Sequence, residues 1–526
     1  MTAMSLLRRA VAGAIVARST VVPFERPDRL PRALGAMAPW GTNLAGTVAA
    51  AAARYPGRIA IHDEQGPTTY GALWDRAQRV AAGLAAGGVG PGTTVGLLCR
   101  NHVGFVSALV AALATGADVV LLNTGFAAPQ LADVVQAEGI GTVIHDDEFA
   151  PVVAGLDART IDESALAGLA ATRSRVRPRR HQGRLIILTS GTTGRPKGAA
   201  RRSDGAIEGV AAVLERIPLR AGDVQVVAAP LFHAWGLTGL LLGIGRCATT
   251  VLARRFDPAA TVAAMARHRA DVLIVVPVML ARILALDPSV LVASPCPSLR
   301  VIASSGSALG SRLATETLSR FGPVLYNLYG STEVAVATIA TPADLLRAPA
   351  TAGRVAFGVR VEILDDRGDP VPDGTVGRVF VGGSMRFSGY TNGGGKEQQR
   401  GLMSSGDLGR FVDGMLFVDG REDDMIVSGG ENVYPIEVEE LLSHHPDVAD
   451  VAVVGVPDDE FGQVLAAFVV ARPGVTADAE ALRSHVRDHL ARHKVPRRVT
   501  FLDELPRNPT GKVLRRVLVD TVGGRP

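Results

Sequence analysis

The chain has 526 residues, of which 47% are hydrophobic, and its formal net charge at pH 7 is +4. One domain usually takes about 100–200 residues, so this length predicts more than one domain. The small net charge gives no indication of nucleic-acid binding. No uninterrupted apolar run approaches the roughly 20 residues of a membrane-spanning helix. We therefore expect a multidomain cytoplasmic protein with a large core.

Cysteine and lysine are both scarce. The three cysteines are scattered, which suits a reducing compartment and gives no disulfide framework or zinc spacing. Only four of the 55 basic residues are lysines. Arginine can replace lysine on a solvated surface but not where a compact ammonium is required, so each lysine is informative. They are Lys197, Lys396, Lys494 and Lys512.

We expect residues 1–44 to form an N-terminal extension of the large domain. Arg8 and Arg9 precede a short apolar stretch that ends near Ala17, a pattern shared by signal peptides and amphipathic helices. Because no clear cleavage site follows, we favour a helix that packs on the body of the protein or rests on a membrane surface.

Strand-like and helix-like stretches then alternate up to about residue 350. Continuous apolar runs separated by helical stretches, such as residues 104–115 and 130–137, predict parallel sheets with helices on both faces. The fold class is thus α/β. Strands are expected at residues 95–99, 118–122, 142–145, 184–188, 224–228, 272–276 and 299–303.

The pattern changes after about residue 350. Residues 350–422 show alternation and turn signals around Asp413-Gly414, which predict an antiparallel, barrel-like part of a large domain 1–422. From Asp423 to residue 526 a small α+β domain is expected. Its elements are a helix at 435–445, strands at 448–454 and 464–470, a helix at 477–492 and a strand at 498–502.

The segment Thr189–Gly198 directly follows the expected strand 184–188. Its glycines let backbone N–H groups close on an anion, its hydroxyls donate hydrogen bonds, and Lys197 adds a charge. It is not a Walker loop, because no Ser or Thr follows the lysine to hold magnesium. We predict a phosphate-binding loop made of Thr189, Ser190, Gly191, Thr192, Thr193, Gly194 and Lys197.

This loop resembles the signature loop of the adenylate-forming superfamily, and further motifs follow in family order. The resemblance runs from about residue 45 to 520 and is strongest to fatty-acyl-CoA synthetases (long-chain-fatty-acid–CoA ligases) of the actinobacterial type. It implies ATP, Mg²⁺ and CoA as cofactors or substrates. The motifs are residues 326–333, 405–407, 419–439 and 506–512.

By this resemblance, three motifs build the nucleotide site. Tyr329 flanks the adenine, Thr332 contacts the α-phosphate, and Glu333 holds magnesium, for which a hard oxygen ligand is suitable. Asp407 and Arg421 grip the ribose hydroxyls.

The resemblance also assigns the parts that alternate between two half-reactions. Asp423 is the hinge, and Lys512 bridges the acid carboxylate and the α-phosphate during adenylation. The loop that lines the pantetheine tunnel comprises Ser428, Gly429, Gly430 and Glu431.

Residues 231–236 resemble the family segment beside the acyl pocket. There His233 would act next to the carboxylate, although a histidine between apolar residues is also a common packed core residue. The other expected pocket residues are Trp235, Gly236, Gly306 and Gly330.

The predicted activity is conversion of a medium- to long-chain fatty acid to acyl-AMP and then acyl-CoA, with release of pyrophosphate and AMP. Two alternatives stay open: an acyl- or aryl-acid ligase that passes the acyl group to a carrier protein, and a non-catalytic relative that binds nucleotide or lipid. A homodimer and peripheral membrane contact are also open.

Overall fold

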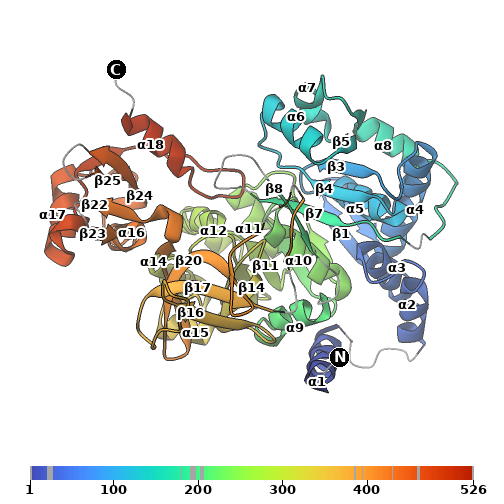
Figure 1. The fold of residues 1–526 in the computed structure, drawn as a ribbon. Coiled ribbons are helices and arrows are strands. Elements are labelled where there is room, and N and C mark those ends of the chain that lie inside the picture. Colours follow the sequence, from blue (N-terminus) through green and yellow to red (C-terminus); the bar gives the residue numbers. More distant parts are fainter. Residues whose placement is uncertain are drawn as a thin grey trace.

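The computed structural model describes most of the chain (Figure 1). Its described residues are 3–20, 28–178, 181–189, 197–201, 206–383, 387–391, 393, 395–428, 431–458 and 462–523. The fold is α/β, with a large N-terminal part built on parallel sheets and a smaller C-terminal part, as the alternating pattern predicted.

One sheet of the large part has the strand order β18-β8-β7-β4-β3-β5-β6. Its central strands are parallel, and their apolar runs are buried on both faces. The bounds are β3 Thr94–Leu98, β4 Asp118–Leu121, β5 Ile140–His145, β6 Arg159–Ile161, β7 Leu185–Thr189, β8 Lys197–Arg201 and β18 Phe387–Tyr390.

The second sheet of the large part has the order β15-β14-β13-β12-β11-β9-β10-β1-β2, again with a parallel centre. Each strand predicted in these two sheets is confirmed to within two residues at either end. The bounds are β1 Ile59–Asp63, β2 Gly66–Thr69, β9 Val224–Val227, β10 Thr249–Val251, β11 Val272–Val275, β12 Val301–Ser304, β13 Leu325–Ser331, β14 Ala335–Ala340 and β15 Arg354–Val355.

The antiparallel region after residue 350 is also present. Its order is β16-β17-β20-β19, with β21 on the other side of β20. The bounds are β16 Arg360–Leu364, β17 Gly377–Gly382, β19 Gln398–Gln399, β20 Leu402–Val412 and β21 Met415–Arg421. One strand of the same stretch, β18, leaves this sheet and pairs with β8 about 190 residues earlier, which the sequence pattern did not predict.

The smaller C-terminal part holds the sheet β23-β22-β25-β24, with β26 beside β25 (Figure 1). Its strands are β22 Ile426–Ser428, β23 Glu431–Val433, β24 Val448–Asp458, β25 Gly462–Ala471 and β26 Arg498–Phe501. Its helices are α16 Pro435–Ser443, α17 Ala479–His489 and α18 Arg515–Gly523, the last of which was not predicted.

The helices of the large part cover its sheets. They are α1 Ala3–Thr20, α2 Arg29–Met37, α3 Leu44–Arg54, α4 Tyr70–Ala86, α5 Val103–Thr115, α6 Ala128–Ala137, α7 Ala150–Val153, α8 Glu163–Ala170, α9 Ala206–Arg216, α10 Ala234–Gly245, α11 Pro258–Arg267, α12 Pro277–Leu284, α13 Pro288–Ala293, α14 Ser311–Phe321 and α15 Pro342–Arg347. None of the described helices is long and apolar enough to cross a membrane.

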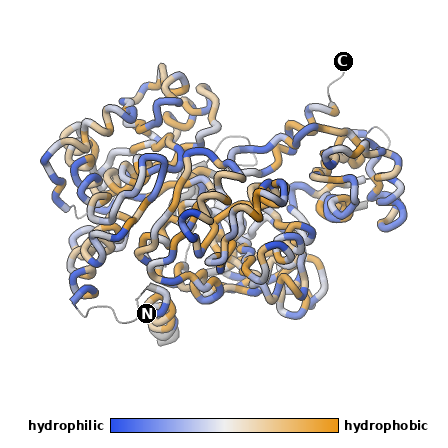
Figure 2. Tube along the Cα trace, turned by 180° about the vertical axis from the view of Figure 1, so that it is seen from behind, coloured by the Kyte–Doolittle hydropathy of each residue, from blue (hydrophilic) through white to orange (hydrophobic). Residues whose placement is uncertain are grey.

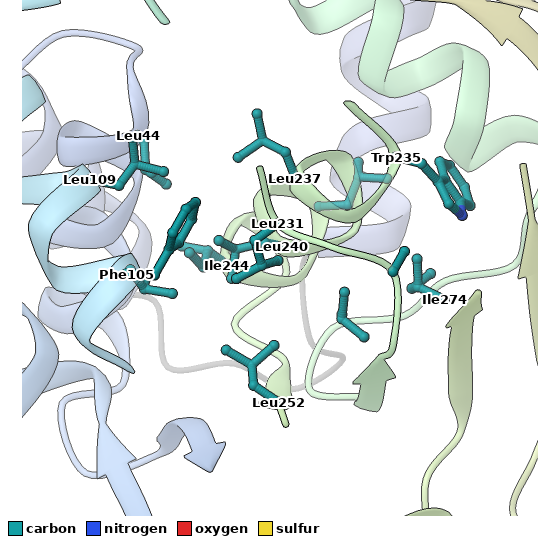
Figure 3. Packing of buried hydrophobic residues seen from close by; sticks show 14 of the residues in the cluster. Leu44, Phe105, Leu109, Leu231, Trp235, Leu237, Leu240, Ile244, Leu252 and Ile274 are labelled. Atoms are coloured by element: carbon teal, nitrogen blue, oxygen red, sulfur yellow. The ribbon is translucent and has the colours of Figure 1, made fainter. Parts of the chain in front are cut away.

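Helix α5 lies at the centre of the large part, and every one of its residues is buried. His102 caps its first turn by accepting from the N–H of Gly104, and Gly116 ends it in the left-handed region at a φ of 86°. Figure 3 shows Phe105 and Leu109 of α5 facing side chains of α10 such as Ile244. Figure 2 shows hydrophobic stretches running through this interior. The packing fixes α10, whose first turn carries the candidate pocket residues.

The expected N-terminal helix is α1, and it packs against α9 of the large part. Ala12 is fully buried in that contact, and Arg9 Nε lies 3.5 Å from Glu208 Oε1 on α9. Of the two placements considered from the sequence, the structure has the packed one.

Candidate functional site

The predicted phosphate loop joins two antiparallel strands. β7 ends at Thr189 and β8 begins at Lys197, and these two residues are register partners. Ser190, Gly191, Thr192, Thr193 and Gly194 lie outside the described residues, as do the side chains of Thr189 and Lys197. The chain therefore turns back after the loop as a β-hairpin, whereas a Walker loop leads into a helix.

Thr332 and Glu333 stand on the tight turn between β13 and β14. The hydroxyl of Ser331 donates to Glu333 Oε2 at 3.0 Å and accepts from the N–H of Glu333 at 3.2 Å. A Cβ on Gly330 would stand 1.8 Å from the carbonyl oxygen of Ala335, so only glycine fits there. The side chains of Thr332 and Glu333 carry oxygen donors, and such donors fit magnesium.

Tyr329 and Asp407 meet although 78 positions separate them in the chain. The phenol of Tyr329 donates to Asp407 Oδ2 at 2.5 Å. Burial raises the pKa of Tyr329, and the negative charge of Asp407 adds to this, so the phenol keeps its proton and remains a donor. Arg421 lies beside Asp407 as its register partner on β21. Tyr329, Asp407 and Arg421 thus form one polar group at the edge between two sheets.

Ser331 and Ser405 make the same local hydrogen bond, each with the backbone of the acidic residue two positions later. The N–H of Asp407 donates to Ser405 Oγ at 3.1 Å, as the N–H of Glu333 does to Ser331 Oγ. A serine two positions before an acid commonly makes such a turn. Sequence reasoning gave no role to Ser331 or Ser405, yet the Ser-X-acid spacing in both motifs was a usable signal.

The C-terminal segment before α18 reaches back to the large part (Figure 1). A Cβ on Gly511 would stand 2.2 Å from Val278 Cγ1 on α12, and one on Gly125 would stand 2.5 Å from Pro509 Cγ. These close contacts at Pro509 and Gly511, just before Lys512, dock the segment against the large part. Desolvation lowers the pKa of Lys512 from its ordinary value although the residue is exposed, and the neighbouring charge of Arg421 adds to the effect.

His233 lies at the start of α10, near Lys512. Burial lowers the pKa of His233 to about 4, and the positive charge of Lys512 contributes further. The imidazole is therefore neutral at pH 7. Residues from three distant parts of the chain, namely His233, Asp407 and Lys512, are brought together, and the spacing of the motifs could not show this.

The expected pocket glycines differ in their surroundings. A Cβ on Gly236 would stand 2.2 Å from the carbonyl oxygen of Pro230, so close packing already requires glycine there. Gly306, with a φ of +105°, has only Val276 Cγ1 at 3.4 Å in that direction. Trp235 is buried and donates from Nε1 to the carbonyl of Val275 at 3.0 Å. Thus Gly306 is the glycine with space beside it, whereas Gly236 and Gly330 are tightly packed.

A small cavity of about 20 Å³ lies between α9 and β14. Val334 and Val336 line it next to the turn that carries Thr332 and Glu333, and Phe357 and Val359 close another side. The charged side chain of Glu208 of α9 lines it as well, so its wall is both polar and apolar.

The residues expected to form the hinge and the pantetheine tunnel lie at the start of the small part. Asp423 accepts from Arg421 Nε at 2.8 Å in a short turn, Glu422–Asp424, between β21 and β22. Ser428 is buried and pairs in register with Glu431, while Gly429 and Gly430 lie outside the described residues.

A buried cluster of Cys99, His102 and Asp146 was not foreseen. His102 Nδ1 accepts from the N–H of Gly104 at 3.1 Å, which leaves the proton on Nε2, 2.7 Å from Asp146 Oδ1. Both ring nitrogens therefore already have partners. The cluster joins α5 to the loop after β5 and serves packing.

Comparison with known proteins matches two family models. Residues 48–391 match the AMP-binding enzyme family, and residues 437–512 match the AMP-binding enzyme C-terminal domain.

Curated relatives and solved structures agree with these matches. The chain is 34% identical to an indoleacetate–CoA ligase of Aromatoleum aromaticum, over 87% of this chain and 94% of the relative. It is 32% identical to the fatty acid–[acyl-carrier-protein] ligase ScoC of Streptomyces coeruleorubidus, over 87% and 92%. The crystal structure of ATP-bound MatB from Rhodopseudomonas palustris superposes with a TM-score of 0.82 at 29% identity, over 91% of this chain and 98% of that one.

Proposed function

Since this chain belongs to the AMP-binding enzyme family, we propose that it activates an apolar carboxylic acid with ATP and transfers the acyl group to CoA. It is an acid–thiol ligase of the AMP-forming type, and such ligases use ATP, Mg²⁺ and CoA. The observation that carries the proposal is the docking of the Lys512 segment on the large part, where Gly511 packs against Val278 and the charge of Lys512 acts on Asp407.

In the first half-reaction an oxygen of the acid attacks the α-phosphorus of ATP. The new bond gives acyl-AMP, and the bond to the β-phosphate oxygen breaks to release pyrophosphate. The acid and the phosphate are both anions, and Lys512 offsets their repulsion in the transition state. Thr332 would donate to the α-phosphate, and Asp407 would accept from the ribose. Magnesium, held by Glu333, would neutralise charge on the phosphates.

His233 has a different task in this proposal. Because its pKa is about 4, it meets the acid as a neutral imidazole and does not compete with Lys512 for the carboxylate charge. It positions the acid, and its neutral form adds no proton to the nucleophile.

In the second half-reaction the CoA thiolate attacks the acyl carbon and AMP leaves. We propose that the small domain, beginning at Asp423, turns about this residue, withdraws Lys512, and presents the segment Ser428–Glu431 to the pantetheine arm. The hydrogen bond that Asp423 accepts from Arg421 supports this proposal, because it connects the proposed hinge with the proposed ribose-binding group.

Apolar side chains near the turn that carries Thr332 and Glu333 support an apolar acid. The cavity beside this turn is lined in part by Val334, Val336 and Phe357, although Glu208 also lines it. A medium- to long-chain fatty acid and an aryl acid both meet this description, and relatives of both names exist. Either acid is larger than this cavity of about 20 Å³, so its binding there would require the lining residues to move.

A carrier protein is the alternative acceptor, because one relative is named for a carrier-protein ligase. Pyrophosphate release would be measured over a panel of fatty and aryl acids, with CoA or with a phosphopantetheinylated carrier protein. We expect pyrophosphate release to depend on the acid, and AMP release to be accelerated by CoA. Turnover with the carrier protein but not with CoA would identify the carrier protein as the acceptor. If no acid led to release of pyrophosphate, the proposed activity would be contradicted.

A further inference from the structure

Helix α14 of the large domain has no capping side chain of its own. Its N-cap residue is Gly310, with a φ of +74°, and the side-chain acceptor comes from the small domain instead. Glu440 Oε1 on α16 accepts from the N–H of Ser311 at 3.0 Å and also from the Ser311 hydroxyl. A carboxylate at a helix N-terminus also interacts favourably with the helix dipole.

Two more contacts lie around this cap. His444 Nε2 is 3.1 Å from the Ser311 hydroxyl, and Arg312 donates to the carbonyl of Ala449 at 2.8 Å. In each contact one partner is in the first turn of α14 and the other is in the small domain. We name the set formed by Glu440, His444, Ser311 and Arg312 the α14 cap contact.

Helix α16 connects this contact to the catalytic lysine. Glu439, next to Glu440, accepts from Arg515 at 2.8 Å and from the N–H of Val453 at 2.7 Å. Arg515 begins α18, three positions after Lys512, and lies 3.5 Å from Asp424 beside the hinge. One turn of α16 therefore holds both the large domain and the base of the lysine segment.

We propose that Glu440 is a positioning residue that holds the small domain in the adenylating pose by capping α14 across the domain boundary. This rests on the proposed function, since Lys512 is the group being positioned. Rotation at Asp423 would remove the cap and leave the first N–H groups of α14 without it. The cap contact thus favours the pose in which Lys512 is docked and opposes the pose that forms the thioester.

The Glu440→Ala variant tests this on isolated half-reactions. Loss of a helix cap corresponds to about a fivefold change in an equilibrium. We expect adenylation to fall by at most about fivefold, because the rate follows the docked fraction, while thioester formation from supplied acyl-AMP is unchanged or faster. Glu440→Gln keeps an acceptor oxygen and should recover most of the loss. Glu437→Ala is the matched control, because Glu437 lies on the same helix but pairs with Lys494 inside the small domain.

A second readout does not depend on any substrate. Spin labels would be attached at Val292→Cys on the large domain and Val475→Cys on the small one, both exposed, with Cys296→Ser to remove the half-buried native thiol. We expect a narrow distance distribution in the parent protein and a smaller docked fraction in Glu440→Ala than in Glu437→Ala. A docked fraction and half-reaction ratio equal to those of the control would overturn the proposal. A lower docked fraction without turnover of any acid would support the cap and contradict the activity.

Discussion

The site residues of the large domain and the lysine segment of the small domain are held in different ways. Asp407 sits in β20, bonded to Tyr329 from another sheet and to the hydroxyl of Ser405. The segment around Lys512 is closed on itself, because Asn508 accepts from the N–H of Lys512 and donates to its carbonyl, both at 2.9 Å. The group of Tyr329, Asp407 and Arg421, which we assign to the nucleotide, is therefore built into the sheets, whereas Lys512 is carried on a compact turn that docks from outside.

The cores of the two domains differ accordingly. The large domain has one extensive buried cluster that runs through α5, α10 and β11. The small domain has separate clusters on the two faces of β24 and β25. Because the small domain is packed on both faces by its own residues, it can change its position without exposing a shared core.

The largest expected effect is the loss of the docked lysine. Lys512→Ala should lower pyrophosphate release by about 10²–10³-fold, since a charge aimed at the transition state is removed. Lys512→Arg should recover little, because a planar guanidinium does not replace a compact ammonium in a desolvated position. A matched control is Lys494→Ala, because Lys494 pairs with Glu437 inside the small domain and lies outside the docked segment.

The sequence predicted the buried strands of the large domain well, but it did not predict the contacts between segments that lie far apart in the chain. Strands such as β4 and β11 were predicted within a residue because fully buried parallel strands are continuous apolar runs. Pairing of β18 with β8, and contact of Gly511 with Val278, depend on tertiary packing between segments that are far apart in sequence. The family resemblance named Lys512 and Asp407, but only the fold shows their shared neighbourhood and the cap by Glu440.

The second largest effect is expected at Asp407, in the group that we assign to the nucleotide. Asp407→Asn keeps the shape but removes the charge that we assign to the ribose hydroxyls, and a hydrogen bond to a charged group is worth about 1.5–3 kcal/mol. We expect KM for ATP to rise by roughly tenfold to a hundredfold, with little change in the KM for CoA. An equal rise in both values would mean that the substitution disturbs the fold as a whole.

A substitution at the proposed hinge, Asp423, should affect the second half-reaction and spare the first. Asp423→Pro fixes one backbone angle in the turn between β21 and β22. Adenylation should persist, and thioester formation should fall by about tenfold, as measured in single turnovers of each half-reaction. If the second half-reaction runs at the parental rate, rotation about Asp423 is not required.

The smallest effect concerns His233, whose pKa is about 4. Its ordinary value is near 6.5, so the folded state resists protonation and loses stability relative to the unfolded state as the pH falls from 6.5 towards 4. The melting temperature of the parent protein should therefore fall by a few degrees more than that of His233→Gln over this range. Parallel melting curves would show instead that His233 titrates like an exposed histidine.

The central claim is that Lys512 is delivered for the first half-reaction alone. The most direct measurement is thioester formation by Lys512→Ala from supplied acyl-AMP and CoA, beside its adenylation rate in the same preparation. The account predicts a thioester rate within about twofold of the parent, alongside an adenylation rate lowered by orders of magnitude. Equal losses in both half-reactions would contradict it.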